Sequence, residues 1–94
     1  MAKTSKKKEK VRNTEFSLLA PQAQSVFVAG HFNQWDPTSH PMKMDEKGMW
    51  NILIPLQPGQ HEYRFFVDGE WQNDPSCCDF VENPFGTSNC LKIV

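Results

Sequence analysis

GQHEYRFFVDGEWQ, residues 59–72, is the stretch of sequence that decides the fold. Asp68-Gly69 between apolar residues is a strong β-hairpin signal, because a type I′ turn requires positive φ at both central residues. Before the turn, side chains alternate between two faces, with His61, Tyr63, Phe65 and Val67 on one and Glu62, Arg64 and Phe66 on the other. The stretch therefore predicts a strand, a two-residue turn and a return strand that starts beside Trp71.

Short strands separated by turn residues are predicted on both sides of this hairpin. They cover residues 14–20, 25–29, 42–44, 49–56 and 87–94. Residues 73–86 have two Asp/Asn-Pro steps and no periodicity, so this segment is predicted to be a long loop. About six or seven short strands, with no helical spacing over more than a turn, predict an all-β fold, specifically an antiparallel β-sandwich.

The charge of the chain is unevenly distributed. Its 94 residues suit one domain, and the net charge is only −1. Residues 1–13 carry six basic side chains and one acidic one, whereas residues 14–94 carry four basic and ten acidic ones. We expect residues 1–13 to be a disordered Lys-rich arm that aids solubility or, alternatively, contacts phosphate groups. The acidic body argues against nucleic acid as the preferred partner.

Cysteine usage and hydropathy predict the compartment. The three cysteines are an odd number, two of them are adjacent, and no apolar signal stretch follows the N-terminus. We therefore expect reduced thiols in a cytoplasmic protein. No apolar run approaches the roughly 20 residues that cross a bilayer, so we expect a soluble protein without a membrane partner.

Catalytic and metal-binding patterns do not stand out. Asp68 and Glu70 flank the hairpin turn, but nothing sets one apart as an acid and the other as a base. The histidines form no HxxxH or HxH pair, and the cysteines lack the spacing of zinc ligands. These residues are His31, His40 and His61, and Cys77, Cys78 and Cys90. We therefore expect a protein that is not an enzyme and that holds no metal or cofactor.

The tryptophans are the informative residues. Trp50 alternates with Ile52 inside a predicted strand, so we expect it in the core. Trp35 and Trp71 lie in turn-rich segments, where exposed rings indicate a binding site unless they cap the ends of the sandwich. Flat rings beside amides and a guanidinium suit a pyranose. Nucleobases also stack on rings, but single-strand binders add a positively charged groove, which the acidic body disfavours.

Four segments together resemble carbohydrate-binding module family 48, which includes the glycogen-binding domain of the AMP-activated protein kinase beta subunit. The segments are VFVAGHFNQWDP (26–37), WNILIPL (50–56), PGQHEYRFFVDGEWQNDP (58–75) and FGTSNCLKIV (85–94). The resemblance covers residues 14–94 and implies an immunoglobulin-like sandwich. It also implies non-catalytic binding of α-1,4-linked glucans such as glycogen, starch, maltodextrin or cyclodextrin.

The resemblance also implies which residues contact the sugar. The stacking tryptophans of the family fall on Trp35 and Trp71, and its basic hydrogen-bonding residue falls on Arg64, where the kinase subunit has lysine. Phe85 takes the place of a smaller apolar side chain that touches the glucan. Thr87 and Asn89 are the expected polar contacts.

Two other functions are compatible with the sequence. In the first, the sandwich serves as an interaction module for a protein partner, such as a glycogen-metabolism enzyme or a kinase complex, through an uncovered edge strand or the Lys-rich arm. Alternatively, the chain is the binding module of an enzyme, separated from its catalytic domain.

Overall fold

The computed structural model describes residues 11–77 and 79–94, and within them it is built from β-strands. The strands are β1 Arg12–Leu19, β2 Val26–Gly30, β3 Lys43–Met44, β4 Met49–Leu56, β5 Gln60–Val67, β6 Glu70–Gln72, β7 Phe80–Glu82 and β8 Ser88–Ile93. A single 3-10 turn, η2 His31–Asn33, follows β2. The all-β prediction is confirmed.

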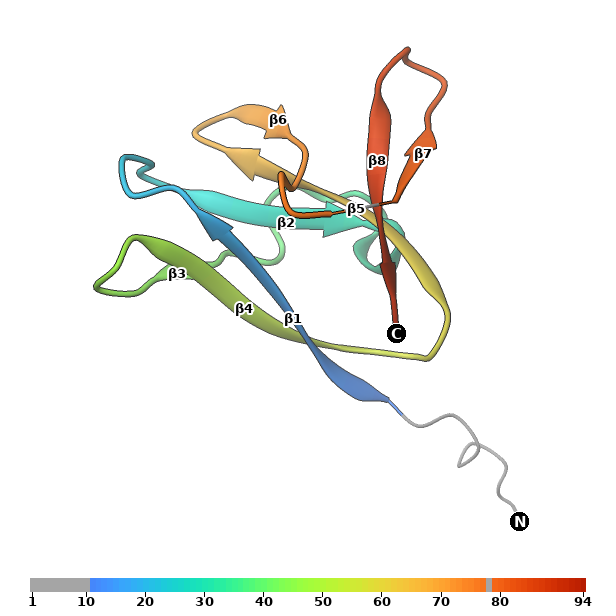
Figure 1. Ribbon diagram of the computed structural model, residues 1–94, viewed down its shortest axis with the longest axis horizontal. Helices are drawn as coiled ribbons and strands as arrows, with labels where there is room; N and C mark the ends of the chain where they lie inside the picture. Colours follow the sequence, from blue (N-terminus) through green and yellow to red (C-terminus); the bar gives the residue numbers. More distant parts are fainter. Residues whose placement is uncertain (1–10, 78) are drawn as a thin grey trace.

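The strands form two antiparallel sheets, which together make the predicted sandwich (Figure 1). One sheet has the order β1-β4-β3. The other has the order β2-β5-β8-β7, and β6 pairs with the end of β5 that β8 leaves open. β5 is thus the central strand, in contact with β2 on one side and with β6 and β8 on the other. The β7–β8 hairpin projects from the body at the upper right of Figure 1.

The core lies between the inner faces of the two sheets. Its largest fully buried side chains are Phe16 from β1 and Tyr63 and Phe65 from β5. The rings of Phe16 and Tyr63 meet edge to face, with centroids 4.9 Å apart. Burying each such ring contributes about 1.5–3 kcal/mol. Trp50 is also buried, as predicted, and its Nε1–H donates to the Ala20 carbonyl at 2.8 Å.

The two sheets differ from the predicted strands at two places. β1 begins at Arg12, two residues before the predicted start, so it includes the end of the expected arm; residues 1–10 of that arm lie outside the described residues. A short strand, β7, forms within the predicted loop 73–86. β7 has only three residues and pairs with β8 alone, so it leaves no alternating pattern long enough to detect.

β2 and β5 approach closely where β2 ends. A Cβ built on Gly30 would overlap the carbonyl oxygen of Glu62 on β5 and the ring of Phe32. Glycine is therefore required here for lack of space, since its extended φ of −171° suits any residue. In the described part of the chain, we find no helix with the length and apolar character of a membrane-spanning segment.

Candidate functional site

The β5–β6 hairpin places Arg64 and Trp71 on the outer face of its sheet. Asp68 and Gly69 have φ values of 49° and 86°, as the predicted type I′ turn requires. The Asp68 carboxylate also accepts hydrogen bonds from two backbone N–H groups just before β2, both at 2.9 Å. The hairpin is therefore fixed both by its own turn and by a side chain that ties its tip to the sheet edge.

Trp71 lies on the surface of this hairpin and outside the core. It stands opposite Phe66 in the register of β5 and β6, and the two ring centroids are 5.0 Å apart. Trp71 keeps 40% of its surface exposed, whereas Trp50 keeps 8%. The two tryptophans thus have the different surroundings that the sequence predicts for them.

Trp35 reaches the same surface through an unusual backbone. Gln34 and Trp35 have φ values of 57° and 59°, in the left-handed region that costs a side chain about 1–2 kcal/mol. Asn33 holds this turn in place, because its buried side chain accepts from the Gly30 N–H at 3.0 Å and donates to the Val28 carbonyl at 3.2 Å. Such strain persists where the surroundings enforce it, and it is common at functional sites.

The turn brings the two indoles together. The ring centroids of Trp35 and Trp71 are 6.3 Å apart, and the ring planes are inclined by 65°. His31 lies on the other side of Trp35, with ring centroids 5.6 Å apart. Asp36 follows Trp35 and accepts from the N–H and hydroxyl of Thr38, and these bonds hold the pKa of Asp36 below its ordinary value. Residues 31–38 therefore form a well-bonded turn around Trp35.

Arg64 lies next to the indoles and is held at two points. Its Nε–H donates to Oδ1 of Asn73 at 2.7 Å, and its Nη1 donates to Oγ1 of Thr87 at 3.4 Å. Asn73 follows β6, and Thr87 precedes β8, so the guanidinium joins the two hairpins. A planar donor fixed in this way offers hydrogen bonds in defined directions.

Phe85 projects from the loop between β7 and β8. Its side chain is 86% exposed. The loop, residues 83–87, is organised by Asn83, whose Oδ1 accepts from the N–H groups of Phe85 at 3.0 Å and Thr87 at 3.2 Å. Asn83 Nδ2 also donates to Thr87 Oγ1 at 2.8 Å. The Asn83 side chain, together with backbone hydrogen bonds from Asn83 N–H to the Thr87 carbonyl and from Gly86 N–H to the Asn83 carbonyl, thus holds the loop that exposes the ring.

All six predicted site residues line one open groove of about 810 Å³. They are Trp35, Arg64, Trp71, Phe85, Thr87 and Asn89. Six further residues complete the lining, namely His31, Glu62, Val81, Glu82, Asn83 and Pro84. The lining combines aromatic and other apolar side chains with a set of polar ones, which is the usual composition of a small-ligand site. The structure therefore brings together residues that are up to 54 positions apart in the sequence, Trp35 and Asn89.

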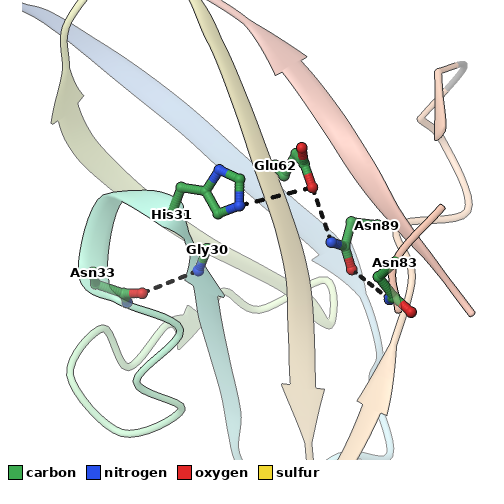
Figure 2. A network of polar contacts seen from close by, with 6 residues as sticks. All are labelled: Gly30, His31, Asn33, Glu62, Asn83 and Asn89. Atoms are coloured by element: carbon green, nitrogen blue, oxygen red, sulfur yellow. Dashed lines mark hydrogen bonds and ion pairs between the residues drawn. The ribbon is translucent and has the colours of Figure 1, made fainter. Parts of the chain in front are cut away.

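Asn89 differs from the other predicted contacts because it is buried. It is only 6% exposed, and its side chain accepts from Asn83 and donates to Glu62, both at 3.0 Å. Figure 2 shows these contacts, together with His31, which lies 3.8 Å from the same Glu62 oxygen. Two of the four hydrogen bonds that an asparagine side chain can make are therefore formed inside the protein.

Sequence reasoning missed Asn83, Glu62 and His31. The Asn83-Pro84 step signals a turn, but it does not reveal that the Asn83 side chain holds the loop. Glu62 was placed correctly on the outer face of its strand, and that was the only available signal. Within residues 11–77 and 79–94, no three His, Cys, Asp or Glu side chains gather in a way that would hold a metal ion.

Comparisons with known proteins identify a family and several relatives. Residues 13–94 match a family described as the glycogen recognition site of AMP-activated protein kinase. The chain is similar to 1,4-alpha-glucan branching enzyme GlgB 1 of Xanthomonas axonopodis pv. citri, with 41% identity over 63 residues, 65% of this chain and 9% of that protein. It is 42% identical over 60 residues to GlgB of Deinococcus radiodurans, which covers 63% of this chain and 8% of that enzyme.

A third relative, GlgB of Rhodopseudomonas palustris, is 39% identical over 61 residues, 65% of this chain and 8% of the enzyme. The chain thus spans less than a tenth of the length of these relatives. The family match is much more extensive, because it runs through every strand from β2 to β8 and nearly all of β1. This chain belongs to the carbohydrate-binding family described as the glycogen recognition site of AMP-activated protein kinase.

Proposed function

We propose that the groove binds α-1,4-linked glucans, such as glycogen, starch fragments, maltodextrins and cyclodextrins, by stacking glucose rings on Trp35 and Trp71. The observation that carries this proposal is the position of the two indoles, side by side in an open groove and outside the core. An aromatic cluster left at the surface usually marks an interaction site. The family match supports the same class of ligand.

The inclination of the indoles favours a curved glucan over a flat one. The 65° angle between the ring planes presents two faces that point in different directions. An α-1,4-linked chain curves, so its successive pyranose rings turn their faces in the same manner. A β-1,4-linked chain is extended and flat, and it would stack on only one of the two indoles at a time.

Arg64, Thr87 and Asn89 supply hydrogen bonds for sugar hydroxyls at the floor of the groove, and Phe85 adds an apolar contact from the loop. Arg64 has donors left beyond those it gives to Asn73 and Thr87, because a guanidinium carries five N–H groups. With few contacts in an open groove, we expect dissociation constants between about 1 µM and 1 mM.

We propose binding without catalysis. Glu62, a carboxylate in the lining, accepts a hydrogen bond from Asn89 and so acts as a structural acceptor. Incubation with maltoheptaose should therefore release no new reducing ends and create no branch points. Cys90 is a buried thiol, which supports the cytoplasmic location inferred from the sequence.

The deciding experiment is a calorimetric titration with maltoheptaose, β-cyclodextrin and cellohexaose. We expect saturable binding of the first two ligands and at least about tenfold weaker binding of the β-linked one, a difference of about 1.4 kcal/mol. Trp71→Ala should abolish measurable binding. Its melting temperature should change by less than about 4–8 °C, the shift that corresponds to 1 kcal/mol. Unfolding of this variant, or wild-type binding of cellohexaose alone, would disprove the proposal.

A second candidate function is docking to a protein partner, and the position of β1 favours it. β1 is eight residues long and lies at the edge of its sheet, where another strand can add to it. Gel filtration with a purified glycogen branching enzyme or kinase complex tests this function. A complex that persists in excess maltodextrin would support docking through the edge rather than through the groove.

A further inference from the structure

The groove has two aromatic walls on different parts of the chain. We call Trp35 and Trp71 the indole wall, and residues 83–87, which expose Phe85, the Phe85 loop. Of the indole wall, Trp35 lies just after η2 and Trp71 lies on β6. The Phe85 loop connects β7 and β8. The register of β7 and β8 ends at Glu82 and Ser88. Within the loop, the Asn83 N–H donates to the Thr87 carbonyl at 3.0 Å and the Gly86 N–H to the Asn83 carbonyl at 3.4 Å, but neither bond reaches the indole wall.

A chain of polar side chains links Asn83, in the Phe85 loop, to Glu62 on β5 (Figure 2). Asn83 Nδ2 donates to Asn89 Oδ1 at 3.0 Å, and Asn89 Nδ2 donates to Glu62 Oε1 at 3.0 Å. His31 lies 3.8 Å from the same oxygen and packs against Trp35. We call Asn83–Asn89–Glu62 the floor relay. It links the Phe85 loop to β5 in addition to the direct hydrogen bond from Arg64 Nη1 to Thr87 Oγ1 at 3.4 Å.

The hydrogen bonds of the floor relay run in one donor-to-acceptor order, from Asn83 to Asn89 to Glu62, and the Glu62 carboxylate determines this order. An ionised carboxylate only accepts hydrogen bonds, whereas an amide can present either its oxygen or its nitrogen. Glu62 therefore makes Asn89 turn Nδ2 toward it, which leaves Oδ1 facing Asn83. Asn83 must then point Nδ2 at Asn89, and its Oδ1 is left for the N–H groups of Phe85 and Thr87.

We propose that Glu62 and Asn83 are positioning residues for glucan binding, which fix the Phe85 loop relative to the indole wall through the direction of this relay. The inference rests on the proposed function and deepens it. When the loop is already held in place, a ligand that touches both walls binds with a smaller entropic cost of ordering the loop. The relay should therefore matter for maltoheptaose, which is long enough to contact both walls, and much less for maltose.

Exchanging the two ends of the relay tests its direction. Asn83→Asp keeps the acceptor that the loop N–H groups need but cannot donate to Asn89. Asn89 then lies between two acceptors, and we expect about fivefold to tenfold weaker binding of maltoheptaose, the effect of about one lost hydrogen bond. Glu62→Gln can still accept from Asn89 and should bind within about twofold of wild type.

The double variant E62Q/N83D should recover wild-type affinity to within about twofold. Its relay runs in reverse, because the glutamine amide donates to Asn89 Oδ1 and Asn89 Nδ2 donates to the new carboxylate. E62A/N83D is the matched control, since it has the same net charge but no donor for Asn89. It should stay as weak as N83D. Glu46→Gln removes an exposed carboxylate outside the groove and should leave the affinity unchanged.

Three results would overturn the inference: wild-type affinity in N83D, recovery in both double variants, which would indicate charge alone, or recovery in neither. If N83D does not fold, the maltoheptaose affinities of Glu62→Gln and Glu62→Ala are compared instead. Equal affinities of these two variants would overturn the inference. A wild-type protein that binds no glucan disproves the proposed function. Wild-type binding with an additive double-mutant cycle disproves only the relay.

Discussion

The two hairpins that border the groove are held in different ways. The β5–β6 turn consists of Asp68 and Gly69, and its shape follows from positive φ at both residues. The β7–β8 loop is longer, and the side chain of Asn83 fixes it from within. A turn shaped by its own backbone can be recognised in the sequence, whereas the shape of a loop that also depends on side-chain contacts becomes evident only when those contacts are known.

The two hairpins also differ in what they contribute. The β5–β6 hairpin belongs to the sheet, and the second residue after its return strand is Asp74, which is buried and accepts from the Tyr63 hydroxyl at 2.8 Å. The β7–β8 loop buries little and exposes Phe85. We therefore expect changes in the turn of the first hairpin to lower folding stability and changes in the loop of the second to lower glucan affinity.

Asp68→Ala should have the largest effect on stability. The change removes the carboxylate that accepts from the N–H groups of Gln24 and Ser25, and it places alanine at a φ of 49°. We expect the free energy of unfolding to fall by about 2 kcal/mol in urea titrations. Asp68→Asn keeps the acceptor and tolerates this φ, so it should remain near wild type. A loss of maltoheptaose affinity without a change in urea midpoint would reverse our assignment of this hairpin.

High pH should destabilise the same hairpin through Tyr63. Burial, followed by the hydrogen bond to Asp74, raises the pKa of Tyr63 above its ordinary value of 10.0. The unfolded chain then loses this proton near pH 10 while the folded chain keeps it, so the stabilisation is present below pH 10 and lost as pH rises above it. At pH 11, one unit above the ordinary pKa, the free energy of unfolding should be lower by about 1.4 kcal/mol.

Tyr63 is the only tyrosine in the chain, so tyrosinate absorbance reports on this residue alone. It should titrate together with unfolding rather than before it. In Tyr63→Phe, stability should be lower at neutral pH, and its slope with pH should be shallower above pH 10. Titration of Tyr63 near pH 10 in a protein that stays folded would contradict this role.

Phe85→Ala should weaken maltoheptaose binding about tenfold, or about 1.4 kcal/mol, and should leave the urea midpoint unchanged. The reason is that Phe85 is 86% exposed, so it contributes apolar area to a ligand and almost none to the core. Phe85→Leu should be intermediate. Calorimetry measures the affinity, and an unchanged affinity for Phe85→Ala would remove Phe85 from the site.

A matched pair of glycines gives the smallest expected effect and the closest comparison of the hairpins. Gly69 and Gly86 have φ values of 86° and 84°, and a Cβ on either would meet no atom within 4 Å. Alanine at each position therefore costs backbone strain alone, about 1 kcal/mol. Gly69→Ala should lower the free energy of unfolding by that amount. The Phe85 loop can relieve this strain by changing its shape, so Gly86→Ala should reduce maltoheptaose affinity by up to about fivefold and leave the unfolding free energy within about 0.5 kcal/mol of wild type. Equal stability losses would show that the loop, too, supports the fold.

Much of the fold was predictable because its signals are local. Alternation along residues 60–67 and the Asp-Gly step specify β5, its buried face and its turn without any knowledge of partners. Trp50 was assigned to the core for the same reason. β7 was missed because its three residues become a strand only by pairing with β8.

The candidate site was predictable to a lesser degree. The family resemblance indicated all six expected residues, and they do line one groove. It did not indicate the left-handed backbone of Trp35, which depends on the buried Asn33 side chain. It also did not indicate the link between Glu62 and Asn89, because these residues are 27 positions apart and meet only when β5 pairs with β8.

Gly30 has a practical consequence for protein engineering. Even a methyl group at this position would collide with the Glu62 carbonyl and force β2 away from β5. The turn that bears Trp35 and the strand that bears Arg64 would then separate, although neither residue had been altered. A design that transfers this groove to another sandwich scaffold must therefore keep a glycine at the position equivalent to Gly30, in addition to the aromatic side chains.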